Sequence, residues 1–392
     1  MPRMRVAVIA DLLEERWPSM DLVAEMLVEC LAREHASEVD AVLIRPPMRH
    51  RFAGTGAWAG RAFSGDRILN RFYHYPRVVG AIRSSFDVFH VVDHSYAQLV
   101  HALPAAQTLV TCHDLDTFRS VLEPEAEPRS WPFKVMTRRI LSGLKRAGHI
   151  ACDTEATRDG LVAKAGIPAA RTTVVHNGPH PSCTPAAEPA ADVEAMRMLG
   201  RRSTVDLLHV GSTIARKRIE TLLRVVASVR DTYPKVRLIR VGGPFTADQR
   251  ALVRELRLDD AILVLPFLDR ATLASVYRHS VVTLLPSERE GFGLPVLESL
   301  ACGTPVIASD IDALREVGGP AATYCGPDDV AGWTAAITTA LVEREQRPAD
   351  WAARKEAGVA RAAAFSWSRY AGDLVPLYRE LARPLSGAGA SS

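Results

Sequence analysis

The stretch that decides the fold reads Ser287-Glu288-Arg289-Glu290-Gly291-Phe292-Gly293-Leu294-Pro295-Val296-Leu297-Glu298, and it follows the apolar run 281–285. An apolar run of strand length, a glycine-containing loop and a proline suited to a first helical turn predict a strand, a loop and a helix in that order. Gly291 and Gly293 permit positive φ angles, with which a loop can turn its amide groups towards a ligand. The unpaired amides at the start of the following helix favour phosphate or sugar oxygens.

Two carboxylates accompany this helix start. Glu290 lies in the loop, and we expect Glu298, eight positions later, on the first turn of the helix. A carboxylate accepts two hydrogen bonds from neighbouring hydroxyls, which suits a ribose diol or a sugar ring. For Glu298 alone, compensation of the helix dipole explains the residue about equally well. For the loop with both glutamates and its proline, ligand binding is the favoured interpretation.

Strands alternate with helical segments on both sides of this stretch, which is typical of a doubly wound α/β architecture. A stretch rich in proline and alanine separates two such halves. We therefore predict a first domain over residues 1–180, a linker over 181–203, a second domain over 204–365 and a final helical segment over 366–384. The strands are predicted at 5–10, 40–44, 87–92, 108–112, 149–152 and 172–175, then at 205–210, 236–241, 261–265, 281–285 and 305–308.

The run from Glu290 to Ser309, E-G-F-G-L-P-V-L-E-S-L-A-C-G-T-P-V-I-A-S, closely resembles the E-x7-E signature of retaining glycosyltransferases of family 4. The resemblance implies the GT-B fold, an α/β fold in which two Rossmann-like α/β/α domains face a central cleft and the C-terminal helix crosses back to the first domain. It also implies that Glu290 contacts the donor sugar and that Glu298 holds the nucleotide ribose. The remaining donor-binding positions that it implies are the loop residues Phe292, Gly293 and Leu294, and Leu268 near the nucleobase.

A second signal lies in the run from His209 to Arg218, where three consecutive cations precede a predicted helix. Cations at a helix N-terminus oppose the helix dipole, and a bound anion such as a pyrophosphate would reverse that effect. The run resembles the V-G-x-x-x-x-R-K stretch of the same family, which implies that Lys217 and Arg216 neutralise the donor diphosphate beside Gly211. Many members carry an arginine directly after Val-Gly, where this chain has Ser212, and we expect Arg216 to take its part.

The first half supplies candidates for the acceptor side. His113 follows the strand predicted at 108–112, and the resemblance implies a contact with the donor sugar near its reacting carbon, although a capping or core role is about equally expected from position alone. We also assign Asp114, His94 and Trp17 to the acceptor side, with a core role favoured for His90, Asp93 and His94. No G-x-G-x-x-G follows the first strand, which argues against a dinucleotide oxidoreductase.

The composition and net charge of the chain argue against some classes of function. The chain is 47% hydrophobic and 24% charged, with no apolar run near the roughly 18 residues that span a bilayer. Because a strand-like run begins directly after Met1-Pro2-Arg3-Met4, we expect no signal peptide and a cytoplasmic protein. A net charge of +3 gives no indication of nucleic-acid binding. Basic residues concentrate at 45–83 and 129–146, where a solvated face is favoured over a peripheral contact with an anionic membrane.

We predict no metal and no cofactor beyond the donor substrate, because cations occupy the predicted diphosphate site and short Asp-x-Asp triplets such as 114–116 and 310–312 arise often by chance. The predicted function is that of a retaining, metal-independent hexosyltransferase that uses GDP-mannose or a UDP-hexose and an unidentified acceptor. Two alternatives stay open: a sugar-nucleotide epimerase of the same fold, and a non-catalytic protein that binds a nucleotide sugar.

Overall fold

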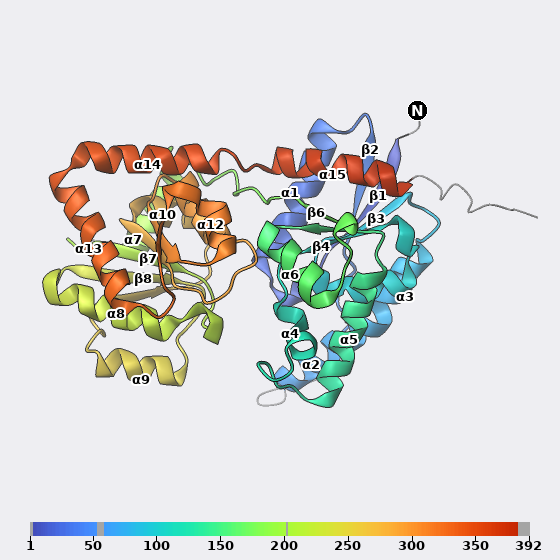
Figure 1. Ribbon diagram of the computed structural model, residues 1–392, viewed down its shortest axis with the longest axis horizontal. Coiled ribbons are helices and arrows are strands. Elements are labelled where there is room, and N and C mark those ends of the chain that lie inside the picture. The colour runs from blue at the N-terminus through green and yellow to red at the C-terminus, as the bar shows by residue number, and fades with distance from the viewer. Residues whose placement is uncertain (1–2, 53–58, 201–202, 383–392) are drawn as a thin grey trace, which may run out of the picture. The chain divides into compact units, whose positions relative to one another are not determined.

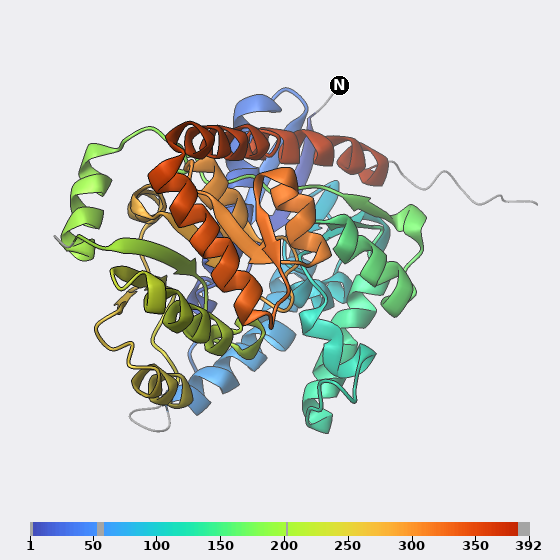
Figure 2. The same ribbon diagram turned by 60° about the vertical axis from the view of Figure 1, so that its left-hand side comes forward.

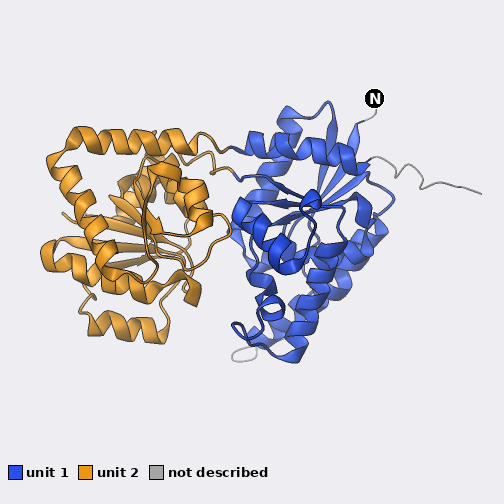
Figure 3. Cartoon of the chain, viewed as in Figure 1, with its two compact units in different colours: residues 1–177, 366–392 blue, residues 178–365 orange. Residues whose placement is uncertain are grey.

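A computed structural model describes residues 3–52, 59–200 and 203–382. The chain divides into two compact units (Figure 3), the first formed by residues 1–177 with 366–392 and the second by residues 178–365. Each unit contains a six-stranded parallel sheet with helices on both faces (Figures 1 and 2). The predicted α/β fold is confirmed, and no helix in the described ranges is long and apolar enough to cross a membrane.

Unit 1 has the strand order β2-β1-β3-β4-β5-β6, with right-handed crossovers expected for parallel neighbours. Its strands are β1 (Met4–Ile9), β2 (Val39–Ile44), β3 (Val88–Val91), β4 (Thr108–Cys112), β5 (His149–Cys152) and β6 (Thr172–Val174). Its helices are α1 (Pro18–Glu34), α2 (Ala59–Leu69), α3 (Tyr75–Ala81), α4 (Arg119–Leu122), α5 (Trp131–Arg146), α6 (Glu155–Ala165) and α15 (Trp367–Ala382).

The alternation of side chains along β1 produces two apolar cores in unit 1. Ala7 and Ile9 point into one core, whereas Val6 and Val8 point into the other. Helices cover both faces, so the central strands β3 and β4 are buried at every position. That explains why these strands appear in the sequence as continuous apolar runs.

The C-terminal helix α15 belongs to unit 1, where it packs beside α1. The hydroxyl of Tyr378 lies 2.7 Å from Nδ1 of His90, whose Nε2 lies 2.7 Å from Oγ1 of Thr111. Burial lowers the pKa of His90 to about 3, so the ring is neutral. The favoured core role of His90 is therefore confirmed: it lies within β3 and ties the last helix to the sheet.

Unit 2 repeats the architecture with the strand order β12-β11-β10-β7-β8-β9. Its strands are β7 (Val205–Val210), β8 (Val236–Val241), β9 (Ile262–Leu265), β10 (Val282–Leu285), β11 (Val306–Ser309) and β12 (Thr323–Cys325). Its helices are α7 (Pro189–Leu199), α8 (Ile219–Thr232), α9 (Ala247–Glu255), α10 (Arg270–His279), α11 (Leu294–Ala301), α12 (Asp312–Gly318), α13 (Val330–Gln346) and α14 (Pro348–Ala362).

Residues 181–203, which we predicted to form a linker, contain a helix in the structure. Much of that stretch forms α7, in which Pro189 lies in the first turn and Asp192 contacts Arg278 of α10 at 2.7 Å. Proline suits a first turn and alanine is a strong helix former, so a composition that suggested a linker also suits a helix that packs on unit 2. The predicted strands also omitted β12, a short edge strand of three partly buried residues.

Candidate functional site

The carboxyl ends of β7 and β8 meet closely in unit 2. Gly242 has φ of +122°, and a Cβ there would lie 2.2 Å from the carbonyl oxygen of Gly211. Arg240, fully buried in β8, donates a hydrogen bond of 2.9 Å from Nη2 to the same oxygen. The loop that follows β7 is therefore held in place from the neighbouring strand, and only glycine fits at position 242.

The loop after β10 ends at Gly293, which has φ of +91° and caps α11. A Cβ on Gly293 would lie 2.4 Å from Cδ2 of Leu314, so the helix start is packed against α12. Of the two glycines that permit a positive φ angle, only Gly293 adopts one, and Gly291 does not. The ring of Phe292 is buried against Phe365, at 6.0 Å between centroids, so this side chain belongs to the core.

Glu290 lies between the two cations of the β7–α8 loop. Nη1 of Arg216 donates to Oε2 of Glu290 at 3.0 Å, and Nζ of Lys217 donates to Oε1. Arg216 also donates to the carbonyl oxygen of Arg289 at 2.8 Å, which joins the two loops. The Glu290 side chain is only 7% exposed, and that of Lys217 only 10%. The structure thus brings Glu290 together with two adjacent cations that precede it by more than 70 residues in the sequence.

The electrostatics of this cluster favour an anion. Burial opposes ionisation of Glu290, but the neighbouring Lys217 and Arg216 outweigh burial and hold its pKa below the usual range. A charged carboxylate between two cations leaves one net positive charge in a largely buried place. Because charges interact strongly where water is excluded, a diphosphate beside the cations would gain substantial attraction.

Glu298 lies in the same helix but not on its first turn, contrary to our expectation. Because α11 begins at Leu294, Glu298 falls in the second turn, where it accepts a hydrogen bond of 3.0 Å from the hydroxyl of Tyr277. Burial raises the pKa of Glu298 to about 7, with the Tyr277 hydrogen bond acting in the opposite direction. Compensation of the helix dipole therefore does not explain this carboxyl, which is held near the point of ionisation.

The other predicted donor-binding residues occupy varied surroundings. Leu294 is the first residue of α11 and is partly buried, and Ser212 is exposed in the β7–α8 loop. Leu268, in the loop after β9, packs against the core that contains Leu265 and Tyr277. The surroundings of these positions do not test their role, so their assignment to the donor stays a prediction.

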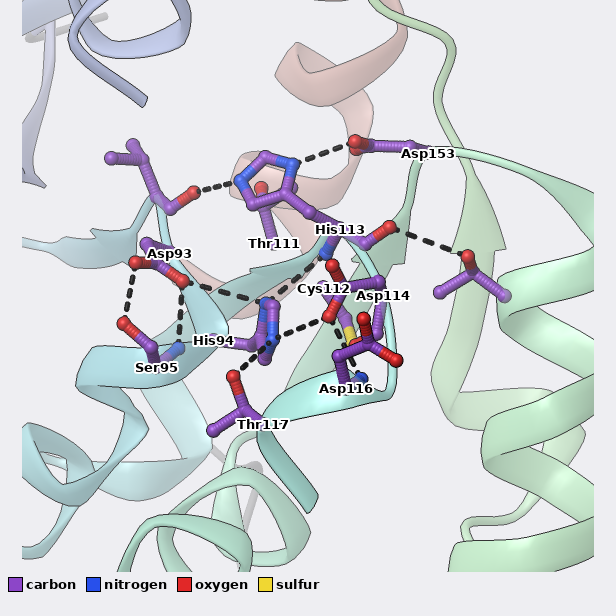
Figure 4. A network of polar contacts seen from close by, with 12 residues as sticks. Asp93, His94, Ser95, Thr111, Cys112, His113, Asp114, Asp116, Thr117 and Asp153 are labelled. Carbon is purple, nitrogen blue, oxygen red and sulfur yellow. Dashed lines mark hydrogen bonds and ion pairs between the residues drawn. The ribbon is translucent and has the colours of Figure 1, made fainter. Parts of the chain in front are cut away.

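A second polar cluster lies at the carboxyl edge of the sheet in unit 1 (Figure 4). Because β3, β4 and β5 are adjacent, the residues that follow them meet there. Nδ1 of His113 lies 2.6 Å from Oδ2 of Asp153, and Nε2 lies 2.7 Å from the carbonyl oxygen of Val92. Asn177 donates from Nδ2 to the same oxygen of Asp153 at 2.8 Å.

Both ring nitrogens of His113 thus face oxygen acceptors, an arrangement that requires two N–H groups. Burial opposes the charge, but the Asp153 carboxylate outweighs burial and raises the pKa of His113 to about 9. His113 is therefore a buried imidazolium with both donors in use. As placed here, its ring is a fixed positive charge and cannot accept a proton from a substrate.

His94 and Asp114 adjoin this imidazolium. Nδ1 of His94 accepts the backbone N–H of His113 at 3.2 Å, and Nε2 lies 3.1 Å from Oγ1 of Thr117. Oδ1 of Asp114 accepts the backbone N–H of Asp116 at 2.9 Å, so the first Asp-x-Asp triplet forms a local turn. Asp310 of the second triplet pairs with Arg315. Among the described residues, no group of three or more His, Cys, Asp or Glu could hold a metal ion.

Trp17 lies apart from these residues, in the loop between β1 and α1. Its side chain is 53% exposed, and Nε1 lies 3.3 Å from Oε2 of Glu15. The same glutamate oxygen lies 3.3 Å from Nη1 of Arg71, whose guanidinium stacks over the ring of Tyr96 at 4.1 Å. No contact in the described part of the chain joins Trp17 to His113 or Asp114.

Sequence reasoning missed Asp153, Arg71 and Arg240. For Asp153 a signal was present: Cys112 of β4 is in register with Cys152 of β5, so the residues that follow these two strands lie opposite each other. Arg240 looked like an interruption of an apolar strand, and Arg71 like one of many surface arginines. Only the packing shows that Arg240 is buried, that Arg71 is partly buried, and that both are hydrogen-bonded.

Comparisons with known proteins agree with this geometry. Residues 22–183 match the family described as Glycosyltransferase Family 4, and residues 201–356 match Glycosyl transferases group 1. A D-inositol 3-phosphate glycosyltransferase of Kineococcus radiotolerans is 31% identical over 60% of this chain and 58% of its own length. An O-antigen chain mannosyltransferase B of Escherichia coli is 27% identical over 79% of each chain. The chain spans little more than half the length of the first curated relatives, 55% to 58%.

Solved structures share the fold. The sucrose-phosphate synthase of Thermosynechococcus elongatus superposes with a TM-score of 0.74 at 21% identity, covering 97% of this chain and 99% of that one. The Anabaena protein HepE, crystallised with UDP and glucose, superposes with a TM-score of 0.71 at 16% identity, covering 96% and 100%. The chain therefore has the GT-B fold, and its two halves are each similar to a glycosyltransferase family model: the first half to Glycosyltransferase Family 4 and the second to Glycosyl transferases group 1.

Proposed function

We propose that this protein is a retaining glycosyltransferase that moves a hexosyl group from a nucleotide sugar to an acceptor hydroxyl without a metal ion. One observation carries the proposal: Lys217, Arg216 and Glu290 form a buried, net positive cluster beside the start of α11, with Glu298 one turn along the same helix. Two cations suit a diphosphate, and two carboxylates suit the hydroxyls of a sugar and a ribose.

In the proposed mechanism Lys217 and Arg216 stabilise the nucleoside diphosphate as it departs. Negative charge develops there in the transition state, and cations fixed beforehand in a partly dry site stabilise it without reorganisation. Glu290 holds both cations in place before the donor binds, and its carboxylate is positioned for a donor hydroxyl afterwards. The acceptor oxygen then bonds to the reacting sugar carbon on the face that the leaving group vacates, while the acceptor proton passes to the departing diphosphate oxygen, which gives retention.

The donor is proposed to be GDP-mannose or a UDP-hexose. The consecutive Arg216-Lys217 pair favours the mannosyltransferase type, and one relative carries that name. The HepE structures carry UDP and UDP-glucose, which supports a uridine donor instead. The acceptor belongs to glycan, glycolipid or glycosylated-metabolite synthesis, and the named acceptor of several relatives is D-inositol 3-phosphate.

In unit 1 we propose that the imidazolium of His113 acts as a fixed charge near the donor sugar. His94 and Asp114 complete this polar edge, with Trp17 on the neighbouring loop. No general-base role is assigned to His113, because both of its nitrogens already donate. This role rests on the position of His113 after β4 and on the resemblance to family 4.

Calorimetric titration with UDP, GDP, ADP and dTDP in EDTA tests the donor site. We expect one nucleotide to bind, and Lys217→Gln to weaken it about 10- to 100-fold, the usual worth of a charge-assisted hydrogen bond. Arg224→Gln is the matched control, because Arg224 is an exposed cation of α8. No binding by any nucleotide, or binding that appears only with magnesium, contradicts the metal-independent site.

Turnover separates the alternatives. A transferase releases the nucleoside diphosphate only when an acceptor is present, whereas an epimerase converts the nucleotide sugar without one. A non-catalytic binding protein does neither. A screen with the donor selected by the titration and a panel of sugar, inositol and lipid-linked acceptors therefore distinguishes the three functions.

A further inference from the structure

Asp11 is a buried carboxyl group that receives no hydrogen bond. It lies just after β1 and is only 2% exposed. Among the described residues, no N–H or O–H group donates to either of its carboxyl oxygens. Asp66, which is 1% exposed in the same unit, accepts the backbone N–H groups of Arg51 at 2.8 Å and Phe52 at 3.3 Å. Buried carboxyls with a structural role are normally bonded as Asp66 is, so such a role does not explain Asp11.

A second carboxyl group lies beside Asp11. Because Ile9 of β1 is in register with Val91 of β3, Asp11 and Asp93 lie opposite each other, two residues further along. Oδ1 of Asp93 lies 3.4 Å from Nδ1 of His94, so the pair adjoins the polar edge of unit 1 (Figure 4). Burial and the neighbouring Asp93 raise the pKa of Asp11 well above its usual range. Asp11 therefore carries a proton, which it shares with Asp93.

Arg71 lies between these carboxyls and two further acceptor groups. Its Nη1 donates to Oε2 of Glu15 at 3.3 Å, and its Nη2 donates to Oγ of Ser95 at 3.1 Å. Gln98 donates from Nε2 to the carbonyl oxygen of Arg71 at 3.3 Å. In the described ranges, the buried Oε1 atoms of Glu15 and Gln98 receive no hydrogen bond. We define the Asp11 cluster as Asp11, Glu15, Arg71, Asp93 and Gln98.

The Asp11 cluster is rich in hydrogen-bond acceptors and poor in donors. Carboxylate and amide oxygens only accept, and both terminal nitrogens of Arg71 already donate within the protein. A ligand with several hydroxyl groups would supply the donors that these oxygens lack. A phosphate group would instead bring further acceptors and a negative charge beside the carboxylates of Asp93 and Glu15. The cluster therefore favours hydroxyl groups over anions.

Exposed apolar side chains lie next to the Asp11 cluster. Nε1 of Trp17 lies 3.3 Å from Oε2 of Glu15, and its side chain is 53% exposed. Leu13, in the same loop, is 56% exposed. An indole ring beside hydroxyl acceptors suits a ring that has hydroxyl groups on its edge and C–H groups on its face. Few polar groups beside apolar side chains are typical of small-molecule sites.

We propose that the Asp11 cluster binds the acceptor, and that the bound part of this acceptor is a neutral ring with several free hydroxyl groups. The inference rests on the proposed transferase function, to which it adds the chemical class of the acceptor. Asp11 is then a specificity-determining residue, since its oxygen accepts a hydrogen bond from a ring hydroxyl. A site that bonds hydroxyl groups discriminates strongly against ligands that leave its buried polar groups unpaired.

Direct binding of small rings tests the inference without turnover. The full chain is titrated with myo-inositol, methyl mannoside, glucosamine, myo-inositol 1-phosphate and mannose 6-phosphate, with and without the nucleoside diphosphate selected by calorimetry. Ligand-observed NMR reports the affinities. We expect the neutral rings to bind at least about tenfold more tightly than the phosphorylated rings, because like charges repel at a binding site. Tightest binding by glucosamine would assign the cluster to a cationic ring and overturn the inference.

Asp11→Asn separates recognition from structure. The variant keeps the shape of the side chain and adds an amide donor that can bond to Glu15 or Gln98. We expect its affinity for the neutral rings to fall about five- to tenfold, with nucleotide affinity unchanged and a thermal midpoint no lower than that of the parent. Glu125→Gln removes an exposed carboxylate from the same unit and serves as the matched control.

Two further results overturn the inference. One is equal affinity for neutral and phosphorylated rings, or binding of none of them. The other is a lower thermal midpoint in Asp11→Asn with unchanged ring affinity, which would make Asp11 a structural residue. Both leave the donor site intact as long as a nucleotide binds. Absence of nucleotide binding contradicts the proposed function instead, and the titrations without nucleotide then still test the Asp11 cluster.

Discussion

Replacement of Glu298 by glutamine should raise the stability of the free protein and weaken its binding of a nucleotide. The carboxyl lies on α11 and accepts a hydrogen bond of 3.0 Å from the hydroxyl of Tyr277. Burial raises its pKa from an ordinary 4.5 to about 7. The free protein therefore holds the ionised carboxylate at a cost in folding free energy, which a ligand with two hydroxyl donors would offset.

The sign of the effect follows from proton linkage. Because the folded pKa lies above the unfolded one, the folded state binds more protons between pH 4.5 and 7, and stability falls as the pH rises through that window. The difference between the folded and unfolded pKa of Glu298 corresponds to a folding free energy of roughly 3 kcal/mol, at about 1.4 kcal/mol per pKa unit. Since Glu298 is only partly buried, solvent screening reduces this to about 1–3 kcal/mol.

Glu298→Gln keeps an oxygen acceptor for Tyr277 and removes the charge. We expect the variant to be more stable than the parent by about 1–3 kcal/mol at pH 8 and by less than about 1 kcal/mol at pH 5. Urea unfolding followed by circular dichroism at both pH values measures the difference. Glu298→Ala, which leaves the buried Tyr277 hydroxyl without its acceptor, should be less stable than Glu298→Gln at either pH. A stability gain that is absent at pH 8, or equal at the two pH values, refutes the reasoning.

The same residue should control nucleotide affinity in the opposite direction. If ribose hydroxyls bind the ionised form of Glu298, affinity should fall about tenfold between pH 8 and pH 6, as expected for a carboxyl with a pKa of about 7. The Gln variant should bind weakly at both pH values despite its greater stability. Calorimetry on both proteins measures this, and a parent affinity independent of pH would contradict the assignment of Glu298 to the ribose.

Three further predictions concern the supporting structure. Asp153→Asn should remove about 3 kcal/mol of folding free energy that the charged His113 contributes through its pairing with Asp153. This contribution is present in full below pH 6.5 and is lost as the pH rises through about 9. The loss of stability measured by urea unfolding should therefore be larger at pH 6 than at pH 10. Gly242→Ala should lower stability by more than about 2 kcal/mol, since the methyl group would meet the backbone of Gly211 at 2.2 Å, and a loss below 0.5 kcal/mol would contradict that contact. Tyr378→Phe should cost about 1 kcal/mol through loss of its hydrogen bond to His90, measured as a shift of the thermal midpoint, with no change in nucleotide affinity.

The fold could be predicted from the sequence because its signals are local. Apolar runs of strand length are visible where helices bury both faces of a strand, and all eleven predicted strands lie within one residue of those observed, for example 108–112 and 236–241. The helix predicted after the cations that end at Arg218 begins at Ile219. The exceptions are β12, which is too short to form a pattern, and α7, whose proline and alanine content resembles that of a linker.

The site could be predicted only in part. The cluster of Glu290 with Lys217 and Arg216 combines residues that two separate motifs singled out, but their direct pairing depends on the packing of two loops. The protonation of His113 depends on Asp153, a residue from the next strand. The turn of α11 that carries Glu298 differs from our expectation because the helix begins at Leu294. Side-chain partners across strands decide charge and pKa, and a single sequence does not display them.

The most direct test of the central claim is acceptor-dependent release of nucleoside diphosphate in EDTA. The protein is incubated with the donor selected by the calorimetric titration, with and without the acceptor panel, beside Lys217→Gln and the control Arg224→Gln. We expect release only with an acceptor, a rate reduced at least about tenfold by Lys217→Gln, and no change in the control. Release that needs no acceptor, that requires magnesium, or that is unaffected by Lys217→Gln would contradict a transferase site built on Glu290, Lys217 and Arg216.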